Sequence, residues 1–169
     1  MITLAFYKGR GSTIWTRLQD WAIRFATRSP YSHVELIVGR AEFGREEVCL
    51  SSSGRDGGVR QTTILLRREH WDLVDMPDQP DDVADFIRAR FGKRYDYIGI
   101  VFSQILSLGR HSPDKWFCSE ICAAALGMPN AQRMSPQALY DVVTWTQMQP
   151  PLVPQAVPAR TVYWTPEIA

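Results

Sequence analysis

The chain has 169 residues, of which 45% are hydrophobic and 22% charged, with a formal net charge of +1. This composition fits one globular domain of ordinary size and excludes intrinsic disorder, which needs low hydrophobicity and high net charge. The near-neutral balance also excludes a nucleic-acid binder held by a basic surface, so we expect no nucleic-acid partner. The apolar runs are too short to span a bilayer, so we expect no transmembrane segment.

The N-terminus and the cysteines bear on the cellular compartment. The first residues, MITLAFYKGR, lack the charged region and the long apolar region of a signal peptide. The chain has three cysteines, an odd number, and it is too long to need a disulfide scaffold. We therefore expect free thiols and a cytoplasmic protein.

The chain opens with a strand and a helix. Residues 2–9 (ITLAFYKG) predict a strand, and a helix is expected from Thr13 to about Thr27 with Ser12 as its N-cap. Apolar side chains recur in this helix at helical spacing, at Trp15, Leu18, Ala22 and Phe25. Most such stripes face a core, and we expect core packing here; a membrane-surface helix is the alternative, favoured only if the stripe is exposed.

A cluster of strands follows, and then helices. Strands are expected at Ser32–Gly39, Val48–Ser53, Val59–Leu66 and Trp71–Met76, with the first two paired as a hairpin. Helices are expected at Pro80–Gly92, Tyr95–Leu108, Cys118–Leu126 and Pro136 to about Thr146. From about residue 149 the chain is proline-rich and extended, and RTVYW is a candidate edge strand. This order predicts a single α+β domain over residues 1–169, with no second domain.

One cysteine and one histidine stand out as candidates for chemistry. Cys118 lies at the expected start of a helix, where free N–H groups and the helix dipole favour a thiolate. A thiol nucleophile also needs a base, and His33 lies on the clearest strand. The other two histidines are weaker candidates, since His70 lies in a charged run and His111 in a loop. From spacing alone, a buried cysteine and an ordinary strand histidine remain the commoner interpretation.

Two further clusters have alternative interpretations. Cys122 follows Cys118 by one helical turn, but zinc needs two more ligands and no partner motif is present, so we expect no metal. Cys49 is expected to pack within a strand. The RDGGVR stretch, residues 55–60, carries two arginines that suit a substrate carboxylate, although a polar hairpin turn is the favoured interpretation.

Four stretches in order, YSHVELIVG, CLSSSGRDGGVR, GKRYDYIGI and WFCSEICAAALG, resemble the permuted NlpC/P60 group of papain-like cysteine hydrolases. The closer resemblance is to YiiX/YaeF-type proteins, some of which occur in phage genomes. In the permuted group the histidine strand precedes the cysteine helix, as His33 precedes Cys118 here. The resemblance implies a permuted papain-like fold, with a small antiparallel sheet packed against helices. It also allows delivery of the protein by a phage system.

The resemblance also implies roles for individual residues. Cys118 matches the nucleophile and His33 the general base, with the Cys118 backbone N–H in the oxyanion hole. Ser119 and Glu120 match a polar pair after the nucleophile, and we expect Ser119 to act as a cap. The family's third polar group, which orients the histidine, falls at about Ser51. A serine cannot stabilise an imidazolium as a carboxylate does, so Glu35, two residues from His33 on the same strand face, is the alternative.

The function that follows from these roles is hydrolysis of an amide or ester through a Cys118 thioester, without a cofactor. The resemblance implies small amides, peptides including peptidoglycan-derived ones, or lipid acyl groups as substrates. The alternative is a catalytically weak or inactive fold used for binding or assembly, which the serine at position 51 favours. The oligomeric state is left open.

Overall fold

The computed structural model describes residues 1–148 except 12, 78, 81 and 96–113. The predicted helix Tyr95–Leu108 therefore lies, apart from its first residue, outside the described part. The same holds for the proline-rich segment from about residue 149 and the candidate edge strand RTVYW.

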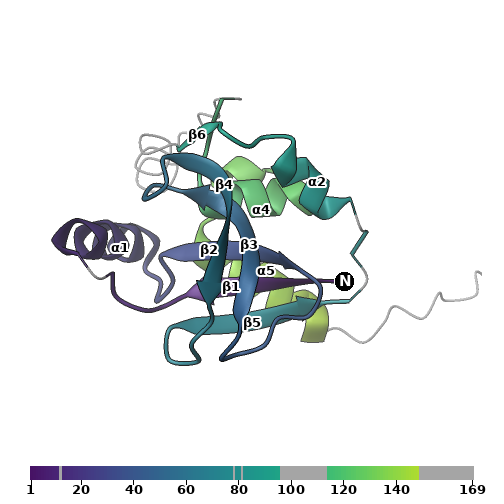
Figure 1. Ribbon diagram of the computed structural model, residues 1–169, viewed down its shortest axis with the longest axis horizontal. Helices are drawn as coiled ribbons and strands as arrows, with labels where there is room; N and C mark the ends of the chain where they lie inside the picture. Colours follow the sequence, from purple (N-terminus) through teal and green to yellow (C-terminus); the bar gives the residue numbers. More distant parts are fainter. Residues whose placement is uncertain (12, 78, 81, 96–113, 149–169) are drawn as a thin grey trace, which may run out of the picture.

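One curled sheet of seven strands forms the centre of the described structure (Figure 1). Its spatial order is β5-β1-β2-β3-β4-β6-β7, and all neighbouring strands are antiparallel except β6 and β7, which run parallel. The strands are β1 (Ile2–Tyr7), β2 (His33–Val38), β3 (Glu46–Ser53), β4 (Gly58–Leu65), β5 (Trp71–Met76), β6 (Arg94–Tyr95) and β7 (Lys115–Trp116). The α+β class is confirmed, and the sheet is mixed rather than antiparallel throughout.

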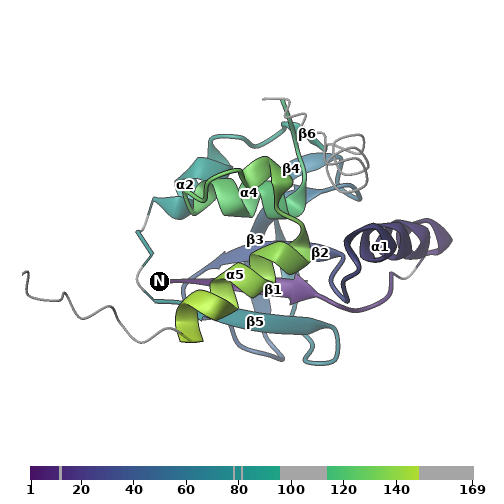
Figure 2. The ribbon, with the colours of Figure 1, turned by 180° about the vertical axis from the view of Figure 1, so that it is seen from behind.

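In the part of the chain that the structure describes, four α-helices and one short 3₁₀ helix accompany the sheet. They are α1 (Ile14–Thr27), α2 (Val83–Arg88), α4 (Cys118–Ala125), α5 (Pro136–Met148) and the 3₁₀ helix η1 (Ala131–Arg133). Seen from behind, α5 crosses β1 and lies on the same side of the sheet as α4 (Figure 2). The helix predicted over Pro80–Gly92 is shorter than expected, because its last residues form turns that end at Gly92 with a positive φ of 80°.

The main core lies between the sheet and these helices. Strand side chains alternate between the two faces of a sheet. The core therefore takes every second residue of the central strands and the apolar sides of α4 and α5: Leu4, Phe6, Val34, Leu36, Leu50, Ile121, Leu139 and Val143. A second, smaller cluster lies on the opposite face and includes Ala5, Ile37, Cys49 and Trp71. His33 and Glu35 alternate with the core residues of β2, so they share the face of Ile37.

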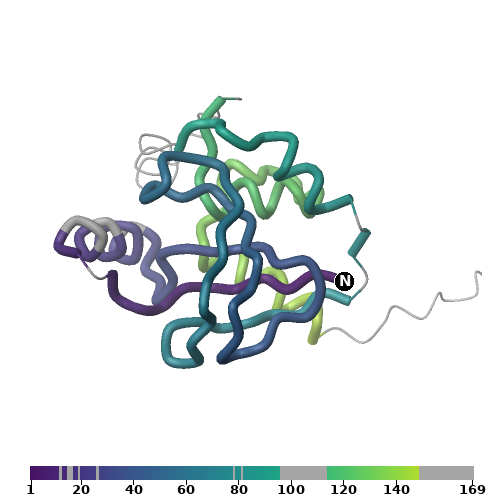
Figure 3. The backbone as a smooth tube through the Cα atoms, viewed as in Figure 1, coloured from purple at the N-terminus to yellow at the C-terminus, as the bar shows by residue number. Residues whose placement is uncertain are grey.

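The helix α1 does not pack as the sequence predicts. It stands to one side of the sheet, joined to the end of β1 (Figure 3). Leu18 and Phe25 are 51% and 73% exposed, and Ala22 is exposed as well, so the prediction of a core-facing stripe is wrong. The side chain of Trp15 lies outside the described part of the structure. The helix is held instead by polar contacts, among them Asp20 with the Gly11 amide and Arg24 with the Gly9 carbonyl.

Candidate active site

Cys118 is the first residue of α4, and His33 is the first residue of β2. Because α4 packs against β2 and β3, the start of the helix meets the start of the histidine strand. The Cys118 thiol and the His33 ring lie within hydrogen-bonding reach of one another. The two residues are 85 positions apart in the sequence, so the fold alone brings them together.

The Glu120 side chain caps the first turn of α4. The Phe117 backbone N–H donates to Glu120 Oε2 over 3.4 Å, which closes the N-terminal turn around Cys118. Ser119 does not cap the helix as expected; its hydroxyl donates to the Met134 carbonyl at 2.7 Å and ties α4 to the segment after η1. Cys118 lies in this first turn, where helix N–H groups have no partner within the helix.

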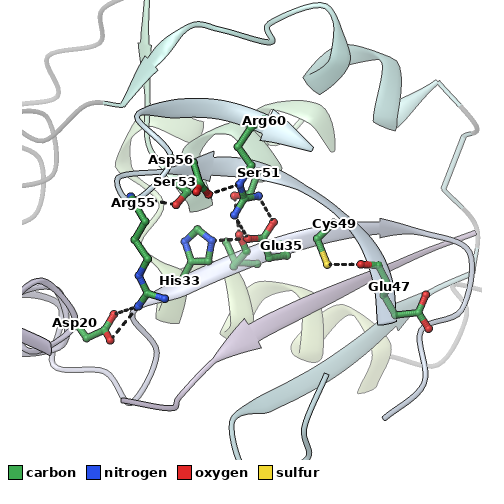
Figure 4. A network of polar contacts seen from close by, with 11 residues as sticks. Asp20, His33, Glu35, Glu47, Cys49, Ser51, Ser53, Arg55, Asp56 and Arg60 are labelled. Carbon is green, nitrogen blue, oxygen red and sulfur yellow. Dashed lines mark hydrogen bonds and ion pairs between the residues drawn. The ribbon is translucent and has the colours of Figure 1, made fainter. Parts of the chain in front are cut away.

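Glu35 holds the His33 ring at its Nε2 atom (Figure 4). Its Oε1 lies 2.6 Å from His33 Nε2, and its side chain is fully buried. Because Nε2 faces Glu35, the remaining ring nitrogen, Nδ1, is the one left for Cys118. The carboxylate thus fixes both the orientation of the ring and which nitrogen carries a proton toward Glu35.

Arg60, on β4, holds the carboxylate in turn. Its two terminal nitrogens bond to the two Glu35 oxygens at 2.7 and 2.6 Å, and its Nε bonds to Asp56 Oδ2 at 2.7 Å. This is the bidentate geometry that makes arginine–carboxylate pairs strong. The site is therefore a chain of alternating charges that runs from Asp56 through Arg60 and Glu35 to His33 (Figure 4).

The sequence favours a polar hairpin turn for residues 55–60 over a site for a substrate carboxylate, and neither interpretation places Arg60 against Glu35. A signal was present, because HVELIVG places a charged residue among apolar ones, and a buried carboxylate needs a partner. The register explains the choice of partner: Arg60 lies opposite Ser51 on β3 and reaches across that strand to β2. Only the fold shows which arginine makes this contact.

The Ser51 side chain makes other hydrogen bonds than the one to His33 that the resemblance implies. Its hydroxyl donates to the Val34 carbonyl at 2.7 Å, and it also bonds to Cys122. β2 pairs with β3 at Leu36 with Leu50 and Ile37 with Cys49, so the Ser51 hydroxyl satisfies a β2 carbonyl beyond the paired region. Ser51 thus stabilises the strand pair, and the hydrogen bond to His33 comes from Glu35.

Neighbouring charges in the series from Asp56 to His33 stabilise one another and shift the pKa values of His33 and Glu35. Burial lowers the pKa of His33, but the electrostatic interactions and hydrogen bonds with Cys118 and Glu35 outweigh burial and raise it from 6.5 to about 9. Burial raises the pKa of Glu35, but His33 and Arg60 outweigh burial and lower it from 4.5 to about 2. At neutral pH the site therefore holds an imidazolium and a carboxylate side by side.

The other candidate residues lie away from this pair or pack in the core. All three cysteines are free and buried, and burial raises the pKa of both Cys49 and Cys122. His70 packs its ring against Tyr7, 6.3 Å between centroids, while His111 lies outside the described residues. Within the described part of the chain, no three His, Cys, Asp or Glu residues gather in a way that suits a metal ion.

A scan against protein-family models finds no match for this chain, and a search of curated proteins finds none. None of the helices in the described part is long and apolar enough to cross a membrane. The candidate site thus consists of a thiol at a helix start, an imidazole within reach of it, and a buried ion pair that orients the imidazole.

Proposed function

We propose that the protein is a cysteine hydrolase, or a related acyl-transfer enzyme, with Cys118 as nucleophile and His33 as general base. The observation that carries the proposal is the contact of Cys118 with a histidine whose other ring nitrogen is bonded to a buried carboxylate. A nucleophile, a base and a group that orients the base are the three parts of a covalent acyl-transfer site. The resemblance of the sequence to permuted papain-like hydrolases supports the same assignment.

The proposed reaction has two halves that use the same residues. The Cys118 thiolate attacks the acyl carbon, the bond from that carbon to nitrogen or oxygen breaks, and the His33 imidazolium gives its proton to the leaving amine or alcohol. A thioester remains on Cys118. Water then attacks the thioester and gives a proton to His33, and the carbon–sulfur bond breaks to release the acid and restore the thiolate.

The backbone supplies the groups that would stabilise the developing oxyanion. The N–H of Cys118 lies in the first turn of α4, where helix N–H groups have no partner within the helix. A preorganised N–H at this point is the usual donor to an oxyanion. Glu35 and Arg60 have a positioning role, because their charges are satisfied by one another and by His33 and not by substrate.

The substrates that fit this proposal are amides and esters. They include small amides, peptides such as those of peptidoglycan, and lipid acyl groups. Arg60 is occupied by Glu35 and Asp56, which leaves Arg55, 46% exposed, as the arginine of this stretch that faces solvent. The fold that goes with the proposal is the permuted papain-like one, in which the histidine strand precedes the cysteine helix.

The test is to trap the thioester. The protein is mixed with a panel of activated esters and anilides, and intact-mass spectrometry measures acylation at each cysteine. We expect a single acyl group on Cys118, and no acylation in Cys118→Ser or His33→Ala. Cys49→Ser is the matched control, because this buried thiol lies outside the site, and it should acylate like the wild type.

The opposite result would favour the alternative function. If no substrate acylates Cys118, or if the label also appears in His33→Ala at the same rate, the protein is a binding or assembly module that keeps the arrangement without the chemistry.

A further inference from the structure

The outer side of α1 carries a continuous apolar stripe. Its members follow one another at spacings of four, three and four residues, which puts them on one side of a helix. They are Ile14, Leu18, Trp21 and Phe25, at 82%, 51%, 60% and 73% exposed. The rings of Trp21 and Phe25 stack at 5.3 Å between centroids and 15° between planes. A contiguous exposed apolar patch of this kind is typical of a protein or membrane interaction site.

The stripe is free because the helix is attached to the body by its other side. Asp20 is 7% exposed and bonds to the Gly11 amide and to Arg55 at 3.3 Å. Arg24 bonds to the Gly9 carbonyl and lies 3.4 Å from the Ser32 hydroxyl. These polar contacts orient α1, which stands to one side of the sheet (Figure 1), so its apolar stripe is not needed to hold the helix in place.

The charges around the stripe indicate the kind of partner. Between residues 9 and 32 the only acid is Asp20, whose carboxylate is buried and paired. Arg17 and Arg28 are both exposed, and they lie beside the stripe because Arg17 precedes Trp21 by four residues and Arg28 follows Phe25 by three. The exposed charge of this surface is therefore positive.

We propose that α1 docks on an anionic lipid surface, with its axis in the plane of the interface and the apolar stripe among the acyl chains. A helix with tryptophan, phenylalanine and leucine on one side and arginine at its border is suited to the boundary between headgroups and acyl chains. A second copy of the chain fits less well, because a symmetric contact through the stripe would bring the arginines of both copies together without a carboxylate between them.

The proposal is independent of the chemistry at Cys118. Binding of the full chain to sucrose-loaded vesicles is measured by sedimentation, with vesicles of phosphatidylcholine alone or mixed with phosphatidylglycerol. We expect binding to the mixed vesicles to be about tenfold tighter than to phosphatidylcholine, and to weaken as salt is added. Cys118→Ser should bind like the wild type, so a failure of the hydrolase proposal would not alter this result.

Two sets of variants separate the stripe from the rest of the surface. Trp21→Ser with Phe25→Ser should lose about a hundredfold in binding, since each side chain contributes roughly tenfold. Trp145→Ser is the matched control, because this tryptophan is 61% exposed on α5 and should not matter. Arg17→Gln with Arg28→Gln should remove most of the preference for phosphatidylglycerol, and it carries the test if the apolar variant fails to fold.

The proposal is overturned if the wild type does not sediment with the mixed vesicles, or if Trp145→Ser weakens binding as much as the stripe variant does. It is also overturned if the stripe instead makes the protein dimerise, which size-exclusion chromatography over a range of concentrations detects in the wild type and finds abolished in the stripe variant.

Discussion

Glu35 is the residue on which the site depends most. Its charged side chain is fully buried, and a buried charge is unfavourable unless it is paired. Here its two oxygens are shared between Arg60 and His33. The arrangement explains how a carboxylate is tolerated in the middle of an apolar strand, and it links the stability of the fold to the orientation of the base.

A double-mutant cycle tests this pairing. Glu35→Leu leaves the Arg60 guanidinium, 15% exposed, without its main partner, and it should lower the free energy of unfolding by about 3–5 kcal/mol. Adding Arg60→Met removes the unpaired charge, so the double variant should lose less than the sum of the two single losses, by roughly 0.5–3 kcal/mol. Urea denaturation measures all four proteins, and simple additivity would contradict the pairing.

At the scale of elements, the sequence predicted most strands and helices because their apolar periodicity is local. The same patterns placed Cys118 at a helix start and His33 on a strand, and the strand spacing identified Glu35 as an alternative to Ser51. What could not be predicted depends on contacts between distant elements. The pairing of Arg60 with Glu35 requires the register of three strands, and the exposure of α1 requires knowing that polar contacts hold it.

The pairing of β4 with β6 depends on a glycine. A side chain at Gly58 would collide with the backbone carbonyl of Lys93, the carbonyl that accepts a 2.8 Å hydrogen bond from the Val59 amide. Gly58 also pairs with Arg94, so the close approach of the strands leaves no room for a Cβ.

Gly58→Ala should therefore destabilise the fold by about 1–3 kcal/mol, because a backbone collision cannot be relieved by turning a side chain. Gln61→Ala is the matched control on the same strand; its side chain is exposed, and the change should stay within about 0.5 kcal/mol. Thermal unfolding compares the two. Equal stabilities would show that β6 does not approach β4 so closely in solution.

At the scale of the whole molecule, the buried charges predict how stability depends on pH. Glu35 has a lowered pKa of about 2, so its contribution is present above its ordinary value of 4.5 and is lost as the pH falls toward 2. His33 has a raised pKa of about 9, so its contribution is complete below its ordinary value of 6.5 and is lost as the pH rises toward 9. Stability should be greatest between these two limits.

The alkaline side of this profile distinguishes His33 from the buried thiols. Unfolding in urea, measured at a series of pH values, should show a decline beginning near pH 6.5 in the wild type. In His33→Gln the decline should begin only near pH 8.5, the ordinary pKa of a cysteine, because burial raises the pKa of Cys49 and Cys122. The same early decline in both proteins would contradict a charged His33 in the folded state.

If Cys118 and His33 form the proposed thiolate–imidazolium pair, His33 should speed the alkylation of Cys118. Cys118 is 1% exposed and Cys49 is fully buried, so a difference between the two in their rates of reaction with iodoacetamide reports chemistry more than burial. The rate at each cysteine is measured by peptide mass spectrometry across the neutral pH range, in the wild type, in His33→Ala and in the control His70→Ala.

We predict that Cys118 reacts at least about tenfold faster than Cys49 near neutral pH, because only the thiolate is nucleophilic. The advantage should be lost in His33→Ala and kept in His70→Ala. If Cys118 instead reacts as slowly as Cys49, or equally fast with and without His33, the pair does not exist and the hydrolase proposal fails with it.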